Sequence, residues 1–227
     1  MCFSATASFT AAAILVPAGM YCLKASNHID KRYRAFAMLP FMFGMQQLLE
    51  GGVWVALLQG DGDSARSFSL GFLLFSHVFW LGWIAYSAYL VEPSARLRRV
   101  FIFISLFGIL FGAFLYAPLL LNNKWMVASI VNHSIDYSLV FMSDAYLPQE
   151  IITILYAMVI LVPLILSSDR YHSRLGVLTL IVGFVAWGFY DWAFISVWCY
   201  FSAVISLYVF FVIAASVQAA HASDAVK

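Results

Sequence analysis

Seven stretches of this chain are apolar over enough residues to cross a membrane as helices. A spanning helix needs about 20 mostly apolar residues to cross roughly 30 Å of hydrocarbon. Charged residues make up 10% of the chain, whereas soluble domains contain about 25%. We therefore predict an all-α, polytopic integral membrane protein, a seven-transmembrane-helix bundle that forms a single domain over residues 1–227. The expected spans are Ser4–Leu23, Ala35–Leu58, Ser67–Val91, Val100–Leu121, Ile151–Ser167, Leu175–Tyr190 and Phe194–Val217.

Basic residues gather in alternate loops between these spans. The first, third and fifth loops are basic, whereas the second, fourth and sixth are neutral or acidic. Because basic loops stay on the cytoplasmic side, we expect the N-terminus outside, the C-terminus inside and a short cytoplasmic tail at 218–227. The chain opens without a basic n-region, so we expect no cleaved signal peptide. The basic loops are Lys24–Arg34, Glu92–Arg99 and Ser168–Arg174.

One loop between spans is longer than the rest. Residues 122–150 combine polar residues such as Asn132 and Asp136 with apolar patches at Trp125 and Leu139. Long ordered loops in compact proteins are often lids or binding elements. We interpret this segment as an external loop or lid that contains a short interfacial helix. A mobile connector is the alternative.

Glu50 is the only acidic residue deep within a predicted span. It shares one helical face with Gln46 and Gln47, because residues four apart lie above one another on a helix. A carboxylate in hydrocarbon is costly, so such a residue usually faces the bundle interior and has a function. We therefore take Glu50 as the centre of a candidate site. The alternative is a protonated acid that only links neighbouring helices.

Other polar residues fall in the outer half of the spans once the orientation is applied. The inner half is almost purely aliphatic and aromatic. This asymmetry predicts a pocket open to the outer face and sealed toward the cytoplasm, and it disfavours a continuous polar pore. The candidate ligand-binding residues are Glu50, Gln46, Gln47, Trp54, Ser4, Ser8, Tyr116, Asp191 and Trp198.

Three residues carry groups that could ligate a metal. Cys2 and Cys199 are expected at similar depth, and His77 is the only histidine within a span. Two thiols, an imidazole and the nearby carboxylate would suit zinc or copper. The chain contains no CxxC, HxxxH or HExxH spacing. A disulfide between Cys2 and Cys199, no joint role, and a purely structural His77 stay as alternatives.

Three segments resemble the recurring features of an uncharacterised bacterial membrane protein family, a domain of unknown function whose members open MCFSATASF. They are Met1–Phe9, Gln46–Trp54 and Ser196–Cys199. The resemblance covers nearly the whole chain and implies no activity. It implies that the family's pattern includes Cys2, Ser4, Ser8, Gln47, Glu50, Trp54, Trp198 and Cys199.

Two seven-span families with known chemistry do not fit. Microbial rhodopsins hold retinal on a lysine in the last span, and Phe194–Val217 contains no lysine, so no retinal Schiff base of that kind is expected. Alkaline ceramidases need an HxxxH pair late in the chain, and this chain has none.

Three functions stay open from the sequence. The first is binding or transport of a small solute or of protons around Glu50. The second is an intramembrane enzyme, dependent on a metal or a thiol, that acts on a lipid or a quinone-like substrate. The third is an accessory subunit of a membrane complex. We expect membrane lipid as a partner, a small-molecule ligand, and a homo-oligomer or a membrane-complex partner. The net charge of +1 gives no reason to expect nucleic acid. The expected location is the bacterial inner membrane.

Overall fold

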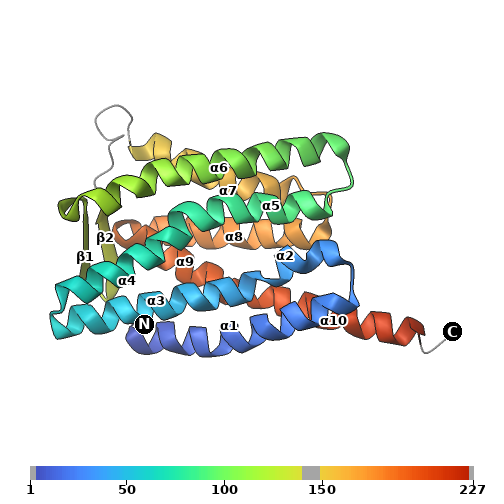
Figure 1. Cartoon of the computed structure of the whole chain (residues 1–227), viewed down its shortest axis with the longest axis horizontal. Helices are drawn as coiled ribbons and strands as arrows, with labels where there is room; N and C mark the ends of the chain where they lie inside the picture. The colour runs from blue at the N-terminus through green and yellow to red at the C-terminus, as the bar shows by residue number, and fades with distance from the viewer. Residues whose placement is uncertain (1–3, 140–148, 225–227) are drawn as a thin grey trace.

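The computed structural model describes residues 4–139 and 149–224. Most of them are helical, and the long helices lie side by side along the long axis of the molecule (Figure 1). The α-helices are α1 (Ala5–Ala25), α2 (Arg34–Ala37), α3 (Leu39–Gln59), α4 (Gly62–Leu74), α5 (Trp80–Val91), α6 (Ala95–Leu121), α7 (Gln149–Ile165), α8 (Arg170–Phe189), α9 (Phe194–Ile205) and α10 (Leu207–Asp224). A π-helical segment, Phe75–Phe79, joins α4 to α5.

Six helical stretches in the described part of the chain are long and apolar enough to cross a membrane. They are Ala5–His28, Lys31–Gln59, Gly62–Val91, Ala95–Leu121, Arg170–Phe189 and Phe194–Ala220. The remaining expected span corresponds to α7, a shorter apolar helix of 17 residues. That length lies at the lower limit for crossing a bilayer. The expected tail from residue 218 continues as helix to Asp224.

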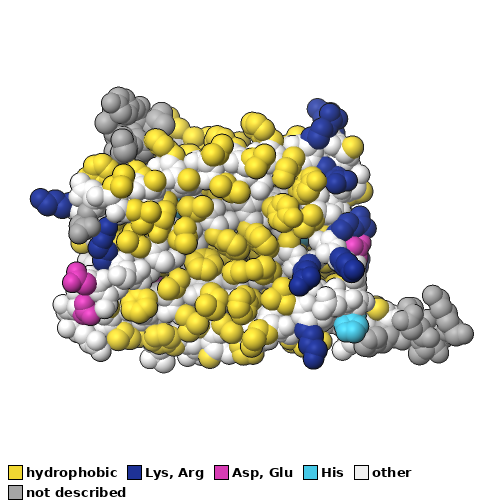
Figure 2. Space-filling view, viewed as in Figure 1, with side chains coloured by type: hydrophobic (Ala, Val, Ile, Leu, Met, Phe, Trp, Pro, Cys, Tyr) yellow, Lys and Arg dark blue, Asp and Glu magenta, His cyan; other side chains and the backbone are white. Residues whose placement is uncertain are grey.

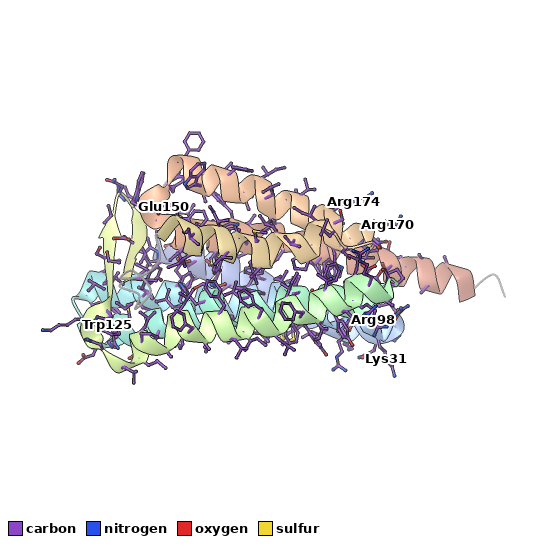
Figure 3. The ribbon with its side chains drawn as sticks, turned by 90° about the horizontal axis from the view of Figure 1, so that it is seen from above. Lys31, Arg98, Trp125, Glu150, Arg170 and Arg174 are labelled. Atoms are coloured by element: carbon purple, nitrogen blue, oxygen red, sulfur yellow. The ribbon has the colours of Figure 1, made fainter. Side chains whose placement is uncertain are left out.

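On the face shown in Figure 2, charged side chains lie at the two ends of the molecule, and an apolar band lies between them. Lys31, Arg98, Arg170 and Arg174 gather at the end from which α10 projects, whereas Trp125 and Glu150 lie at the opposite end (Figure 3). We call the first the basic end. The three loops at this end are the basic loops of the sequence, Lys24–Arg34, Glu92–Arg99 and Ser168–Arg174.

Close helix packing in the bundle depends on glycine at particular points. A Cβ on Gly112 of α6 would overlap the carbonyl oxygen of His77, and one on Gly19 of α1 would overlap the backbone of Phe41 in α3. Small residues let membrane helices approach closely, which increases their van der Waals contact. These two glycines therefore fix α6 against the π-helical segment and α1 against α3.

The loop opposite the basic end contains a β-hairpin, which was not expected from the sequence. Strand β1 (Met126–Val131) pairs antiparallel with β2 (Ser134–Leu139). The connecting Asn132 and His133 have φ angles of 46° and 60°, as tight two-residue hairpin turns require. A short 3₁₀ helix, Asn123–Trp125, precedes the hairpin. The sequence analysis did not expect the strands, although β-branched residues and an asparagine turn favour a hairpin. Residues 140–148 of the loop lie outside the described residues.

The hairpin turns one face into the bundle. Ile135 and Tyr137, two positions apart on β2, are both buried, because alternate strand residues point to the same side. They pack in one apolar cluster with Trp54 of α3, Phe72 of α4 and Cys199 of α9. The hairpin therefore covers the part of the bundle that holds Glu50.

Candidate functional site

Glu50 lies within α3 and is 1% exposed. Its Oε2 accepts a hydrogen bond of 3.0 Å from Gln47 Nε2, one turn earlier on the same helix. Its Oε1 accepts a hydrogen bond of 2.5 Å from the hydroxyl of Ser196 on α9. Both carboxyl oxygens are therefore satisfied inside the bundle. Ser196 was absent from the predicted ligand set, since linear spacing does not show that α9 faces α3.

The two neighbouring glutamines are also buried, and each is only half satisfied. Gln46 Oε1 accepts a 2.8 Å hydrogen bond from the indole of Trp80 on α5. Within the described residues, Gln46 Nε2 and Gln47 Oε1 have no hydrogen-bond partner. Buried polar atoms are normally paired, and each exception calls for an explanation. The glutamine pair therefore offers one donor and one acceptor to a water or small ligand.

Cys199 lies one turn after Ser196 on α9 and is buried. Its thiol is close enough to Glu50 for the two groups to interact electrostatically. The Gln46 side chain lies beside it, without the geometry of a hydrogen bond. Glu50, Gln46 and Cys199 therefore lie close together in the bundle.

Tyr137 of the hairpin closes this cluster. Its ring stacks on Phe72, with centroids 5.0 Å apart and planes 11° apart. Its buried hydroxyl has no hydrogen-bond partner in the described part of the chain. Burial raises the pKa of Tyr137 well above its usual value, and nearby Glu50 and Cys199 raise it further. The sequence analysis missed this residue, although its alternation with Ile135 is a strand signal.

The remaining candidate ligand residues are spread around this centre. Trp54 is buried one turn beyond Glu50, in the cluster that contains Tyr137. The Tyr116 hydroxyl donates a 3.0 Å hydrogen bond to the carbonyl of Leu70, which links α6 to α4. The Trp198 indole donates to the carbonyl of Thr179 on α8 at 3.4 Å. Tyr116 and Trp198 therefore use their polar groups to join helices.

Three further candidates lie at the ends of helices or within α1. Ser4 caps α1 by accepting a hydrogen bond from the backbone N–H of Ala7 at 3.2 Å. Ser8 is buried on the same helix. Asp191 begins a short 3₁₀ turn, Asp191–Ala193, and its side chain is outside what the structure describes.

The expected metal ligands do not form a complete set within residues 4–139 and 149–224. No group of three or more His, Cys, Asp or Glu in these ranges is placed to hold a metal ion. His77 lies in the π-helical segment, with Nδ1 2.9 Å from the hydroxyl of Ser76. Cys2 lies outside the described residues, so a zinc or copper site that includes it stays a prediction.

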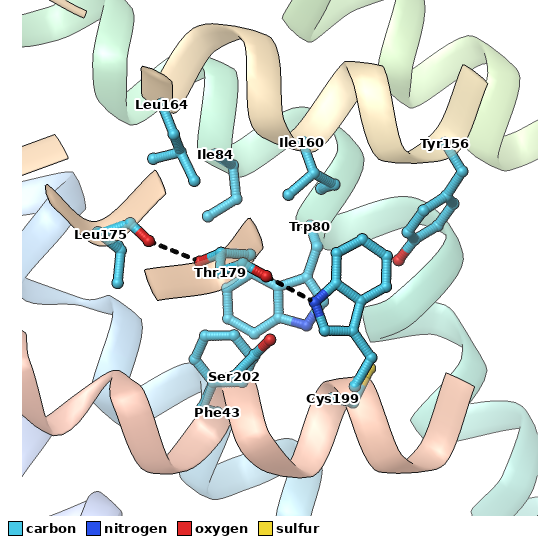
Figure 4. A pocket seen from close by; sticks show the side chains of 11 residues that line it. Phe43, Trp80, Ile84, Tyr156, Ile160, Leu164, Leu175, Thr179, Cys199 and Ser202 are labelled. Atoms are coloured by element: carbon cyan, nitrogen blue, oxygen red, sulfur yellow. Dashed lines mark hydrogen bonds between the residues drawn. The ribbon is translucent and has the colours of Figure 1, made fainter. Parts of the chain in front are cut away.

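A small cavity lies beside the Glu50 cluster, inside the bundle (Figure 4). Its volume is about 50 Å³. Trp80 and Cys199, which contact the Glu50 cluster, form part of its wall, as do Ile84, Leu175 and Ser202. A water needs at least about 10–15 Å³ of such space, so the cavity is large enough for a few water molecules.

A second hollow opens on the side of the bundle, as a groove of about 430 Å³. Ser4, Thr6 and Thr10 of α1 line one wall, and Tyr200 and Val204 of α9 line the other. Glu50 lines neither hollow. The carboxyl is thus enclosed in this structure, with the hairpin over it.

A second buried polar network lies at the basic end, and the sequence analysis missed it. Asp169, at the N-cap of α8, accepts hydrogen bonds from the Tyr33 hydroxyl at 2.6 Å and the backbone N–H of His172 at 3.0 Å. Its Oδ2 lies 2.8 Å from His172 Nδ1. His172 Nε2 lies 3.3 Å from the hydroxyl of Ser87 on α5. Tyr33, Asp169 and His172 belong to the basic loops Lys24–Arg34 and Ser168–Arg174, whereas Ser87 lies in the predicted span Ser67–Val91.

Burial alone would raise the pKa of Asp169, but hydrogen bonds outweigh it. The bonds from His172 and Tyr33 lower the pKa of this carboxyl to about 2. Asp169 is therefore a carboxylate at neutral pH.

Next to Asp169, the hydroxyl of Ser168 donates a hydrogen bond to Glu92 Oε1 at 2.7 Å, which links the loop before α8 to the loop after α5.

The chain belongs to a family of unknown function, DUF6629, which matches residues 1–225. This confirms the resemblance to an uncharacterised domain-of-unknown-function family. Comparisons with curated proteins and with solved structures found no match.

Proposed function

We propose that this protein binds and transports protons or a small solute at Glu50, as a seven-span protein of the bacterial inner membrane. The observation that carries the proposal is a carboxyl held inside the apolar band, 1% exposed, with no ion pair in the described chain. An ionised carboxylate is costly in hydrocarbon without a counter-charge. Uptake of a proton or a small cation removes that cost.

The surroundings of Glu50 favour protons or a very small solute. Gln46 Nε2 and Gln47 Oε1 supply a spare donor and a spare acceptor close to the carboxyl. The adjoining cavity of about 50 Å³ is far below the roughly 300–1,000 Å³ of pockets that hold drug-sized ligands. Water molecules and protons fit such a space, whereas a metabolite requires a rearrangement.

The distribution of charge supports an orientation with the basic end in the cytoplasm. In this orientation α7 is the fifth span, the N-terminus is outside and the hairpin is an external lid. Tyr137, packed on Phe72, then separates Glu50 from the outside. Exchange of Glu50 with the outer solution requires the hairpin to move away from the bundle.

The test is proton flux into proteoliposomes that contain the purified protein and an internal pH dye, driven by a potassium diffusion potential. We expect Glu50→Gln to abolish the flux while the protein stays monodisperse. Asp63→Asn is the matched control, because Asp63 is an exposed acid. Flux through Glu50→Gln at the wild-type rate would show that Glu50 is not the transport site.

A further inference from the structure

The network at the basic end is a continuous line of hydrogen-bonding groups from the surface to the bundle interior. Tyr33 is partly exposed, whereas His172 and Ser87 are fully buried. Successive contacts measure 2.6 Å from Tyr33 to Asp169, 2.8 Å from Asp169 to His172 and 3.3 Å from His172 to Ser87. A buried imidazole in such a line can take up a proton at one ring nitrogen and release a proton from the other.

The hydroxyl of Ser87 accommodates both charge states of His172. It donates to the carbonyl of Ile84 at 2.8 Å. In that arrangement Nε2 donates to Ser87 while Nδ1 donates to the Asp169 carboxylate, so the ring holds two protons and is cationic. When Nε2 loses its proton, the hydroxyl can rotate and donate to it instead. A proton can therefore be held at, or released from, Nε2 without leaving a nitrogen unpaired.

This trio has the residue types of a hydrolase triad, but its setting does not suit a nucleophile. Ser87 has 0% exposure and lines neither cavity described above. The ring of Phe36 lies 4.4 Å from that of His172, centroid to centroid. An acyl substrate has no approach to the hydroxyl, whereas a proton needs only a hydrogen-bonded neighbour or a water.

The cavity lies between this network and Glu50. One end is lined by Trp80, which donates to Gln46, and by Cys199. The other end is lined by Ile84 and Leu175, each one turn from a member of the network. Trp80 and Ser87 are separated by about 10 Å along α5 at 1.5 Å per residue, a distance that a short chain of water molecules can bridge.

We propose that His172, held by Asp169, is a second proton-binding site, which exchanges protons with Glu50 through the cavity and with the cytoplasm through Tyr33. The inference rests on the proposed function of Glu50. It adds the part of the proton route that runs from Glu50 toward the basic end. Protons on this route pass Ile84 and Leu175, which line the cavity one turn from the network.

Several other ionisable groups lie around the network at the basic end. Asp169 is a carboxylate at rest, because its pKa is about 2. It is protonated only while it passes a proton between His172 Nδ1 and the Tyr33 hydroxyl, which gives its own proton to water. Asp30 and Tyr171 interact electrostatically with Tyr33. Arg170, in the first turn of α8, interacts electrostatically with Asp169. Tyr208 of α10 lies near Arg174, Tyr171 and Asp169.

The test uses the same proteoliposomes, with proton flux recorded while the pH on the basic side is varied. We expect His172→Gln to slow the flux at least tenfold. We expect Ser87→Ala, a smaller change, to slow it and to alter its dependence on that pH. His28→Gln is the control, because His28 is an exposed histidine at the same end. A structural defect alone would reduce the amount of folded protein without altering the pH profile.

The outcomes separate the two proposals. If folded His172→Gln and Ser87→Ala both conduct at the wild-type rate while Glu50→Gln does not, the inner route is wrong and the Glu50 site stands. If Glu50→Gln conducts normally, the proposed function itself fails. If His172→Gln does not fold, Ser87→Ala decides: an unchanged rate and pH profile overturn the inner route.

Discussion

Ser196 and Glu50 are 146 positions apart in the chain, yet the hydroxyl of one donates to the carboxyl of the other across the α3–α9 interface. This bond fixes one carboxyl oxygen, while Gln47 fixes the other at 3.0 Å. A buried acid held on both oxygens cannot turn toward another helix without losing a partner. The site is therefore preorganised around one position of the carboxyl, and the unpaired atoms of Gln46 and Gln47 border it.

Ser196→Ala tests this bond. Removing the hydroxyl leaves Glu50 Oε1 buried without its donor from α9, so we expect the free energy of unfolding to fall by about 1–2 kcal/mol. Thermal denaturation in detergent measures the change. Ser196→Thr is the control, since it keeps a hydroxyl. Equal stability of the alanine variant and wild type would contradict a structural contribution from this bond.

Trp80→Phe tests the anchor of Gln46. Phenylalanine can keep the stacking on Phe43, whose ring centroid lies 3.9 Å from that of Trp80, but it has no N–H for Gln46 Oε1. A buried acceptor without a donor costs about 1–3 kcal/mol, so we expect a lower melting temperature and a lower proton flux. Trp83→Phe is the matched control, because that indole donates to a backbone carbonyl, of Ala35, at 3.1 Å. Equal losses in both variants would argue against a special role for the Gln46 contact.

Much of the fold follows from the sequence, because a run of about 20 apolar residues in a membrane has few alternatives to a helix. The burial of Glu50 follows for the same reason. The hydrogen-bond partners of Glu50 do not follow from the sequence. The spans are apolar around most of their circumference, so no face marks the interior, and nothing in the chain shows that Ser196 meets Glu50 or that Ser87 meets His172. Tyr137 was missed because residues 122–150 were interpreted as a loop with a short helix, whereas the alternation of Ile135, Tyr137 and Leu139 with polar residues indicates a strand.

Tyr137→Ala tests the hairpin as a lid. The truncation removes the ring that packs on Phe72 and lies near Cys199. In a background with Cys2 and Cys22 changed to serine, we expect a membrane-impermeant maleimide, added outside, to label Cys199 at least tenfold faster than in the parent protein. Val127→Ala is the control, since Val127 is on the same hairpin but exposed. If both variants label at the parent rate, the hairpin does not limit access to the site.

Asp169 predicts how stability depends on pH. Its pKa is lowered from 3.8 to about 2 because hydrogen bonds from His172 and Tyr33 outweigh the cost of burial. A carboxyl with a lower pKa in the folded protein adds stability above its unfolded pKa, and this is lost as pH falls from about 4 toward 2. The contribution at neutral pH is about 2 kcal/mol. We expect Asp169→Asn to lower the melting temperature at pH 6 and to flatten its decline between pH 5 and 3. Asp63→Asn, at an exposed acid, should retain the wild-type decline, and an equally steep decline in Asp169→Asn would contradict the assignment.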